Sequence, residues 1–332
     1  MLQRQEQIKV GINDLIINKE SQKSIIELKY VDSFVLLPVE PFNFRYTLWK
    51  PSHFYTGLEA HSVQYSWRTY KLGEKPLGTK IYMNNNNLVV DIFAEGNLDA
   101  QDISSLKNRI THSYGLNEDL SCLENIKCSH NYLCKAIEDL YGMHISCPEN
   151  LFEISIVSLL LQNTTIKRTT GMFQNLIDYY GQLVTFDNIC LRVFFTPLDM
   201  VSVDEAELKE KCRLGYRAKF VNNYARYFVD NDDNSLQSYD KETLLKELQT
   251  IKGVGPYTAN VIAAHSLRDF KAIPFDSWNR KIIGGRLFGK SDLEASVLQN
   301  MMENMFGDYA GLIALYLIEY EYINNPVVPL ID

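Results

Sequence analysis

Near residue 100 the spacing of apolar residues changes from a period of two to a period near 3.6, and this change limits the fold more than any other feature of the sequence. Before it, alternating apolar residues in 42–48 and 63–67 are typical of strands with one buried face. Two further short runs, 81–83 and 88–93, flank the asparagines of 84–87, which tolerate the left-handed backbone of a hairpin turn. The first third of the chain is therefore predicted to form a small antiparallel sheet.

After residue 100 the apolar spacing predicts helices. The clearest of them cover 103–110, 151–161, 172–180 and 209–228. Pro148 with Glu149 precedes the second as a helix start, and Gly181 follows the third as a stop. We expect an α+β protein in which an antiparallel β domain, residues 1–120, is followed by an all-α region, residues 121–332.

Composition excludes several classes of protein. The chain has 332 residues, 46% of them apolar and 22% charged, so it can bury sizeable cores and is not expected to be disordered. Its apolar runs are far shorter than the roughly 18 to 20 residues that span a bilayer, and we expect a cytoplasmic protein with no membrane partner. Six cysteines in a chain of this length indicate reduced thiols. The net charge of -8 opposes general attraction to nucleic acid, so DNA binding would need a local basic stripe.

Residues 241–266 have the pattern of two helices joined by a tight turn, Lys252-Gly253-Val254-Gly255-Pro256. The two glycines let backbone N–H groups approach a ligand, and the proline suits the first turn of the second helix. A helix N-terminus with free amides binds anions, and a DNA phosphate is the obvious anion. We predict that Gly253, Val254 and Gly255 contact DNA, and that Lys252 is a phosphate contact or a surface charge.

Asp276 precedes another helical run, and its simplest interpretation is an N-cap that accepts hydrogen bonds from the first amides of that helix. It also lies about twenty residues after the glycine-rich turn and directly after Pro274-Phe275. A Gly-Val-Gly turn followed at this distance by a proline and an aspartate resembles the signature of the helix-hairpin-helix (HhH-GPD) DNA glycosylase superfamily.

Three further segments resemble the 8-oxoguanine DNA glycosylase branch of that superfamily. They are residues 163–168, 214–219 and 306–311. The matches follow the order of the family over about residues 150–320, and the β region before them resembles the N-terminal sheet of that branch. The resemblance implies an antiparallel β lobe beside two helical lobes, and a monomer whose partner is double-stranded DNA containing a damaged base.

The resemblance also assigns roles to single residues. Asn163 matches the residue that fills the hole left by a flipped nucleotide, and Tyr216 matches the wedge against the stacked bases. Arg168 and Arg217 match the pair that holds the orphaned cytosine together with Asn163. Asp276 matches the catalytic carboxylate, which stabilises positive charge on the deoxyribose and orients or deprotonates the attacking water. Taken alone, Tyr216 is better interpreted as a core residue and Arg217 as a solvated helix charge, and the joint match in sequence order reverses that preference.

Six cations that accompany a single acid, Glu210, predict a basic patch in this otherwise acidic chain. They are Lys209, Lys211, Arg213, Arg217, Lys219 and Arg226.

The sequence departs from the family at the position of the lyase amine. Bifunctional members carry a Lys one residue after the position of Pro256, and this Lys forms a Schiff base with the sugar. Tyr257 stands there, and a phenol cannot form an imine. Alkylpurine glycosylases of the superfamily also carry an aromatic residue at this position. We therefore predict a monofunctional, hydrolytic enzyme of base excision repair that removes a damaged purine, either oxidised or alkylated.

The predicted base pocket departs as well. Ala314 stands where 8-oxoguanine glycosylases carry a base-reading Gln, Ile318 where they carry a stacking Phe, and Pro51 where a Gly senses oxidised guanine. The aromatic residues expected to be available to stack on a flipped purine are Tyr257, Trp278 and Tyr316. The resemblance thus leaves the damaged base open, and the orphan-cytosine residues favour a purine derived from guanine.

No cofactor and no metal are expected. Many members bind a [4Fe-4S] cluster through four cysteines after the catalytic Asp, and no cysteine follows Cys212. A zinc site of Cys122, Cys128, Cys134 and His130 fits less well than buried or surface thiols, because the spacing is not that of a zinc knuckle. Two other functions stay open, namely a catalytically silent lesion-binding protein and a bifunctional 8-oxoguanine glycosylase/lyase that uses another Lys.

Overall fold

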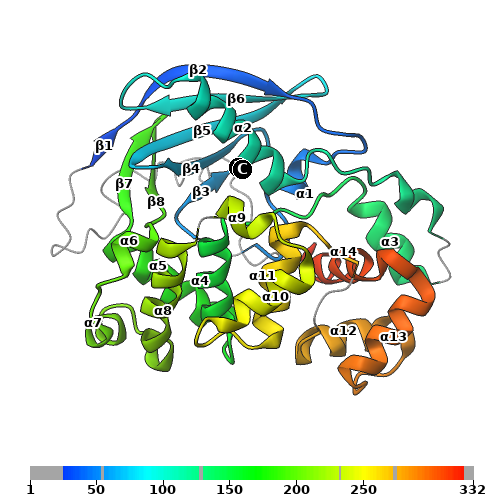
Figure 1. Ribbon diagram of the computed structural model, residues 1–332. Coiled ribbons are helices and arrows are strands. Elements are labelled where there is room, and N and C mark those ends of the chain that lie inside the picture. Colours follow the sequence, from blue (N-terminus) through cyan, green and yellow to red (C-terminus); the bar gives the residue numbers. More distant parts are fainter. Residues whose placement is uncertain (1–24, 54–55, 127–129, 232, 272–274, 325–332) are drawn as a thin grey trace, which may run out of the picture.

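Five antiparallel strands form the N-terminal sheet in the computed structural model, which describes residues 25–53, 56–126, 130–231, 233–271 and 275–324. The order across the sheet is β2-β6-β5-β4-β3 (Figure 1). The strands are β2 (Lys29–Leu36), β3 (Glu59–His61), β4 (Ser66–Leu72), β5 (Lys75–Asn84) and β6 (Asn87–Ala94). The predicted antiparallel sheet is thus confirmed.

The hairpin between β5 and β6 forms where the asparagine run predicts it, since Asn84 pairs with Asn87 and Asn85 adopts a left-handed φ of 54°. One face of the sheet is covered by helix α2 (Ala100–Tyr114), whose Leu106 and Ile110 are completely buried. Asp99 and Asp102 form a capping box at the start of this helix. The sheet and α2 therefore enclose one apolar core.

The predicted strand over 42–48 is wrong. These residues form helix α1 (Phe44–Leu48), because the Asn43 side chain accepts a hydrogen bond from the backbone N–H of Tyr46 and caps the first turn. Apolar residues four apart, such as Phe44 and Leu48, fit one face of a helix as well as alternate positions of a strand. In 63–67 only the C-terminal residues Ser66 and Trp67 lie in β4, and Val63 is exposed in the preceding turn.

A second sheet corrects the prediction that the region after residue 120 is all helix. It has the order β1-β7-β8, in which β1 (Ile26–Glu27) pairs in parallel with β7 (Gln182–Phe186), and β7 pairs antiparallel with β8 (Ile189–Val193). The turn of this hairpin is Asp187-Asn188, with φ of 46° and 62°, as a two-residue hairpin turn requires. The hairpin packs on the main sheet so closely that a Cβ on Gly78 would lie 2.7 Å from the Phe186 ring.

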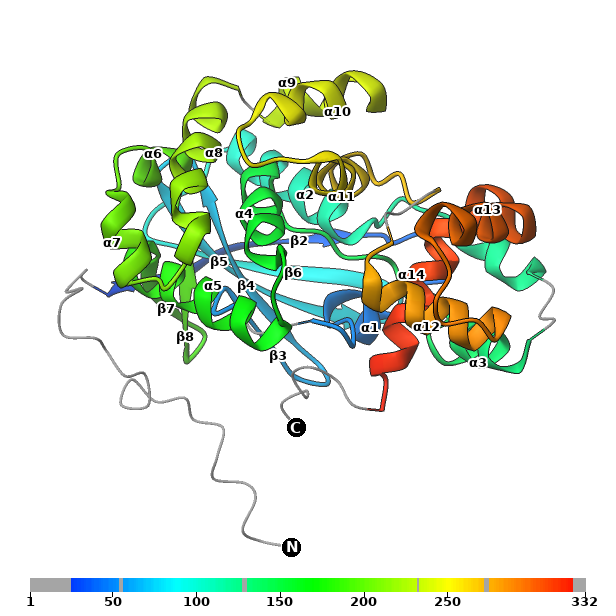
Figure 2. The same cartoon turned by 90° about the horizontal axis from the view of Figure 1, so that it is seen from below.

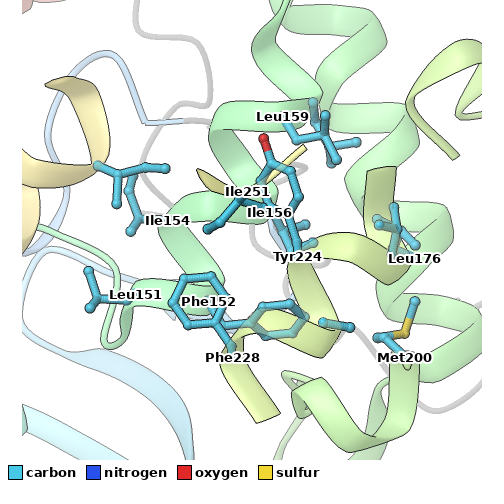
Figure 3. Packing of buried hydrophobic residues seen from close by; sticks show 14 of the residues in the cluster. Leu151, Phe152, Ile154, Ile156, Leu159, Leu176, Met200, Tyr224, Phe228 and Ile251 are labelled. Carbon is cyan, nitrogen blue, oxygen red and sulfur yellow. The ribbon is translucent and has the colours of Figure 1, made fainter. Parts of the chain in front are cut away.

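The first helical lobe surrounds α4, a helix that is apolar on nearly every side. The rings of Phe152 and Phe228 pack in its core near Tyr224 at an interplanar angle of 58° (Figure 3). The elements of this lobe are α4 (Leu151–Leu161), α5 (Ile166–Tyr180), α6 (Pro197–Met200), α7 (Glu205–Glu210), the 3-10 turn η2 (Gly215–Arg217), α8 (Ala218–Asp230), α9 (Asp233–Gln237), α10 (Lys241–Thr250) and α11 (Pro256–Leu267).

The predicted helices agree with this lobe except in one place. The helix over 151–161 is confirmed with Asn150 as its N-cap, and α5 ends at Gly181 as predicted. The continuous helix predicted over 209–228 is divided into α7, η2 and α8. Arg213 and Gly215 adopt φ of 56° and 60° at the break, a backbone conformation that no α-helix contains.

Two distant parts of the chain form the second helical lobe, which lies beside the first (Figure 2). Its elements are η1 (Ser121–Asn125), α3 (Asn131–Asp139), α12 (Ser277–Phe288), α13 (Ala295–Phe306), η3 (Gly307–Tyr309) and α14 (Ala310–Tyr322). Leu133 from the early part and Leu298 and Leu317 from the late part share its core. The chain therefore passes from the sheet through the second lobe, completes the first lobe, and returns to the second.

A buried ionic network joins the main sheet to the first helical lobe. Arg68 on β4 contacts Glu59 on β3 at 2.9 Å and Glu153 on α4 at 3.1 Å. Burial alone would raise the pKa of Glu59, but the charges of His53 and Arg68 hold it well below its usual value. Within the described ranges no helix is long and apolar enough to cross a membrane.

Candidate active site and DNA-binding surface

The turn between α10 and α11 has two glycines in different environments. Gly253 has φ +106°, and a Cβ there would lie 2.7 Å from the Phe220 ring, so a side chain is excluded by conformation and by space. Gly255 is the N-cap of α11, and a Cβ there would meet no atom within 4 Å. Val254 is buried between them and donates its N–H to the Ile251 carbonyl at 3.0 Å. The turn is thus anchored in the core at Gly253 and open to an approaching ligand at Gly255.

The N-terminus of α11 is electrostatically suited to an anion. No side chain caps it within the described residues, and Pro256 occupies its first turn. Uncapped N–H groups and the positive end of the helix dipole attract phosphate. Lys252 is exposed one residue before Gly253 and adds a mobile positive charge. The arrangement agrees with the predicted phosphate contact.

Asp276 is the N-cap of α12, as the plainer sequence interpretation predicts. Its Oδ1 accepts hydrogen bonds from the backbone N–H groups of Trp278 at 2.8 Å and Asn279 at 2.7 Å. Both bonds reach the same oxygen, so among the described contacts Oδ2 is unengaged, and the residue is exposed. Capping therefore fixes the carboxylate without using up its capacity to bind. The preceding Ile273 and Pro274 of the motif lie outside the described residues.

Aromatic side chains gather around Asp276. Burial and the charge of Asp276 raise the pKa of Tyr257 to about 12. Burial raises the pKa of Tyr322 on α14, and Glu319 and Asp276 raise it further. The rings of Trp278 and Tyr322 stack with centroids 5.3 Å apart and an interplanar angle of 25°. The carboxylate thus lies among Tyr257, Trp278 and Tyr322.

Tyr322 is missing from the residues predicted for this site. A usable signal exists, because it follows Ile318 by four residues, and positions four apart share one face of a helix. Tyr322 therefore lies on the same face of this helix as Ile318, the face predicted to line the pocket.

Two of the residues predicted to be available at the pocket have different surroundings from those expected. Ala314 and Tyr316 are completely buried in the core of the second lobe, and the Tyr316 hydroxyl donates to the Met143 carbonyl at 2.7 Å. The expected availability of Tyr316 for stacking is wrong, and the burial of Ala314 does not support contact with a base. Ile318 is half-buried at the edge of that core, and Pro51 is buried in the loop after α1.

Glu319 connects this loop to α14, and the sequence gives no sign of it. The carboxylate is only 3% exposed and accepts hydrogen bonds from the Ser52 N–H at 2.8 Å and the Ser52 hydroxyl at 2.6 Å. These bonds tie Ser52, the residue after Pro51, to Glu319, which directly follows Ile318 on α14. The β lobe therefore reaches the predicted pocket wall through a buried, charge-assisted contact.

The residues predicted to face the opposite strand lie on the first helical lobe. Asn163 is exposed directly after α4 with a left-handed φ of 47°, and Arg168 is exposed in the first turn of α5. Tyr216 is 44% exposed, which contradicts its alternative as a core residue.

Arg217 differs from this group. It is 2% exposed, and its guanidinium donates to the carbonyls of Leu159 at 3.2 Å and of Gln162. It is therefore neither a solvated helix charge nor, in the unbound protein, a donor open to an orphaned base.

The predicted basic patch is smaller than its sequence indicates. Lys209 pairs with Glu205 at 2.6 Å and Lys211 with Glu207 at 3.2 Å, and the Arg217 charge is buried. The exposed cations that remain are Arg213, Lys219 and Arg226. Cys128 of the alternative zinc site lies outside the described residues, and no group of three potential metal ligands occurs within them.

The sequence model of the HhH-GPD superfamily of base excision DNA repair proteins matches residues 156–306, which include the hairpin and Asp276. This region of the chain, residues 156–306, belongs to the HhH-GPD superfamily. A relative in Saccharomyces cerevisiae, an N-glycosylase/DNA lyase, is 27% identical over 268 residues, which are 75% of this chain and 68% of that protein. The chain is therefore a DNA glycosylase of base excision repair.

Two solved structures show the same fold over nearly their whole length. The 3-methyladenine DNA glycosylase from Archaeoglobus fulgidus has a TM-score of 0.73 at 16% identity and matches 88% of this chain and 99% of its own. The Clostridium acetobutylicum 8-oxoguanine glycosylase/lyase, in complex with double-stranded DNA containing cytosine opposite 8-oxoguanine, has a TM-score of 0.68 at 20% identity and matches 91% and 99%. Enzymes for alkylated and for oxidised purines thus share this architecture.

Proposed function

We propose that this DNA glycosylase is monofunctional, and that it flips a damaged purine out of duplex DNA and removes it by hydrolysis at Asp276. The observation that carries the proposal is an exposed carboxylate, fixed by two backbone N–H groups, among three aromatic side chains at the start of α12. In the reaction the bond between the base nitrogen and C1′ breaks, and the base leaves with the bonding electrons. Water adds to C1′ and gives up a proton, while the Asp276 carboxylate stabilises the positive sugar and accepts that proton.

Tyr257 supports the hydrolytic route. With a pKa raised to about 12, the phenol stays protonated at neutral pH and lacks the amine that a Schiff base requires. It remains a hydrogen-bond donor and an aromatic surface beside the carboxylate. We therefore assign it to contact with the flipped base or the sugar.

The substrate is a damaged purine, and the aromatic residues favour an electron-poor one. Tyr257 and Trp278 are 46% and 36% exposed, and Trp278 is supported from behind by Tyr322. Rings with accessible faces bind flat bases by stacking and attract a base that carries positive charge. An alkylated guanine or adenine has both properties. An oxidised guanine has the first, and it remains within the proposal.

The DNA would lie across the turns of the first helical lobe. The open N-terminus of α11, from Gly253 to Gly255 with Lys252, would hold a phosphate of the damaged strand. Asn163 would fill the space of the flipped nucleotide, Tyr216 would wedge against the stack, and Arg168 would bind the orphaned base. Arg217 would join them only if DNA binding released it from its two carbonyl partners.

One observation favours a second candidate. The yeast relative is named an N-glycosylase/DNA lyase, so a bifunctional enzyme that uses a lysine elsewhere in the chain is the alternative. It would leave a covalent protein–DNA complex when treated with borohydride during turnover, because the reagent reduces the imine. A monofunctional enzyme would leave none.

The experiment is base release from duplexes that contain 8-oxoguanine, 7-methylguanine, hypoxanthine or 3-methyladenine, each opposite cytosine or thymine. We expect release of a purine, strand scission only after alkali, and a loss of about 100-fold or more in the Asp276→Asn variant. Scission without alkali together with borohydride trapping would support the lyase instead. Tight lesion-specific binding without release of any base would support a silent lesion-binding protein.

A further inference from the structure

Gln162 lies where three DNA-facing turns of the first lobe meet. It is the C-cap of α4 and the residue directly before Asn163. Its side chain donates a hydrogen bond to Gly253 in the hairpin turn, 91 residues later in the chain. Its backbone carbonyl accepts hydrogen bonds from Tyr216 and Arg217 in the turn η2.

The side chain of Gln162 fixes the hairpin from below. Its amide nitrogen donates to the Gly253 carbonyl at 3.2 Å and to the Thr258 hydroxyl at 3.2 Å. The two acceptors lie on opposite sides of the N-terminus of α11, and Thr258 is only 5% exposed. Because both amide hydrogens are used, the orientation of the side chain is determined by the hairpin.

The main chain of Gln162 fixes the other turn. Its carbonyl accepts from the Arg217 guanidinium and from the Tyr216 hydroxyl at 3.4 Å, and Arg217 also donates to the Leu159 carbonyl at 3.2 Å. Arg217 therefore caps the C-terminal carbonyls of α4, where the helix dipole favours a cation. Burial lowers the pKa of this guanidinium, but not by enough to remove its charge at neutral pH.

These contacts define the place of Asn163. Its left-handed φ of 47° is a conformation that asparagine tolerates, and the hydrogen bonds of Gln162 fix the backbone directly before it. We infer that Gln162 is a positioning residue that couples the hairpin's grip on the DNA backbone to the placement of Asn163 opposite the flipped base. The inference rests on the proposed function, in which Asn163 fills the space of the flipped nucleotide.

The test measures binding and does not require catalysis. Fluorescence anisotropy would give the affinity for duplexes with a tetrahydrofuran abasic site opposite each of the four bases. We expect Gln162→Met, which keeps length but donates no hydrogen bond, to reduce the preference among opposite bases about tenfold, in line with the loss of two hydrogen bonds. Gln299→Met is the matched control, since the side chain of Gln299 donates to Glu303 on the surface of α13, and this change should leave the preference unchanged.

A second set of variants separates positioning from general damage. Thr258→Val removes one acceptor and should lower the preference in the same direction, whereas Thr258→Ser keeps the hydroxyl and should not. This pair carries the test if Gln162→Met fails to fold. In the Asn163→Ala background Gln162→Met should cause little further loss, because its effect passes through Asn163.

The outcomes distinguish a failure of the role inferred for Gln162 from a failure of the role proposed for Asn163. If Gln162→Met leaves the opposite-base preference of the wild type intact, the role of Gln162 is overturned. The same follows if Gln162→Met causes as large a loss of preference in the Asn163→Ala background as in the wild type. Absence of any opposite-base preference in the wild type would overturn the proposed role of Asn163, and with it this inference.

Discussion

Replacing Gly253 by alanine should destabilise the protein, whereas the same change at Gly255 should not. An alanine at φ +106° carries a backbone strain of at least about 1 to 2 kcal/mol, the penalty for a left-handed L-residue. Its Cβ would also lie 2.7 Å from the Phe220 ring, and such overpacking costs about 1 to 3 kcal/mol. The stiffer unfolded chain returns about 0.4 to 1 kcal/mol. We expect Gly253→Ala to lower the free energy of unfolding by about 2 to 4 kcal/mol.

Chemical denaturation followed by circular dichroism measures this change, and the Phe220→Ala background divides it into its parts. Without the ring, Gly253→Ala should cost only the backbone strain less the amount that the stiffer unfolded chain returns, a net loss of about 1 kcal/mol. A loss below about 0.5 kcal/mol for Gly253→Ala in the wild-type background would refute the reasoning.

Gly255→Ala is the control that separates stability from function. Its φ lies in the ordinary range, since φ is -90°, and its Cβ would meet no atom of the protein within 4 Å. We expect unchanged stability but weaker binding to abasic duplex, because the methyl group would occupy the space through which a phosphate approaches α11. Unchanged binding would contradict the placement of the phosphate there.

Three further predictions concern charge and protonation. Arg168→Ala should lower discrimination among opposite bases at almost no cost in stability, whereas Arg217→Met should cost about 2 to 4 kcal/mol in denaturation experiments because two carbonyls lose a buried donor. Burial and the charges of Lys50 and Arg268 lower the pKa of His265 from 6.5 to about 4, so the unfolded chain binds a proton that the folded protein rejects. The free energy of unfolding of the wild type should therefore fall by up to about 3 kcal/mol as the pH is lowered from 6.5 to 4, and that of His265→Gln should fall by less. Equal slopes of unfolding free energy against pH in the two proteins would contradict this. Since the pKa of Tyr257 is about 12, the pH profile of base release by Tyr257→Phe should parallel that of the wild type from pH 6 to 9, and the loss of one limb would assign the phenol a proton-transfer role.

Much of the candidate site could be predicted because its signals are local. The Gly-Val-Gly turn needs its glycines for conformational reasons that the sequence expresses directly, and Asp276 caps the helix that follows it. The exposed positions of Asn163 and Arg168 follow from a short loop between two well-marked helices. The order of the motifs along the chain indicates which residues belong to the site, but it gives no distance between them.

The errors arose where a local pattern has two solutions. Phe44 and Leu48 are compatible with a strand and a helix, and the cap at Asn43 decides in favour of the helix. The 182–193 segment alternates as a strand does, but its helical flanks hid the hairpin that pairs with β1 and packs on Gly78. The pairing of β7 with β1 and the packing of this hairpin on Gly78 join residues far apart in the chain, so no local rule predicts them.

The sequence by itself determined the order of sheet and helices, the hairpin turn, the capping aspartate and the absence of an amine at position 257. Only the tertiary structure decided which side chains are available. It buried Tyr316 and Arg217, brought Tyr322 to Asp276, tied Ser52 to Glu319 and made Gln162 the junction of three turns. The physical reason is that propensity and capping act within a few residues, whereas burial and hydrogen bonding between distant segments depend on how the lobes pack.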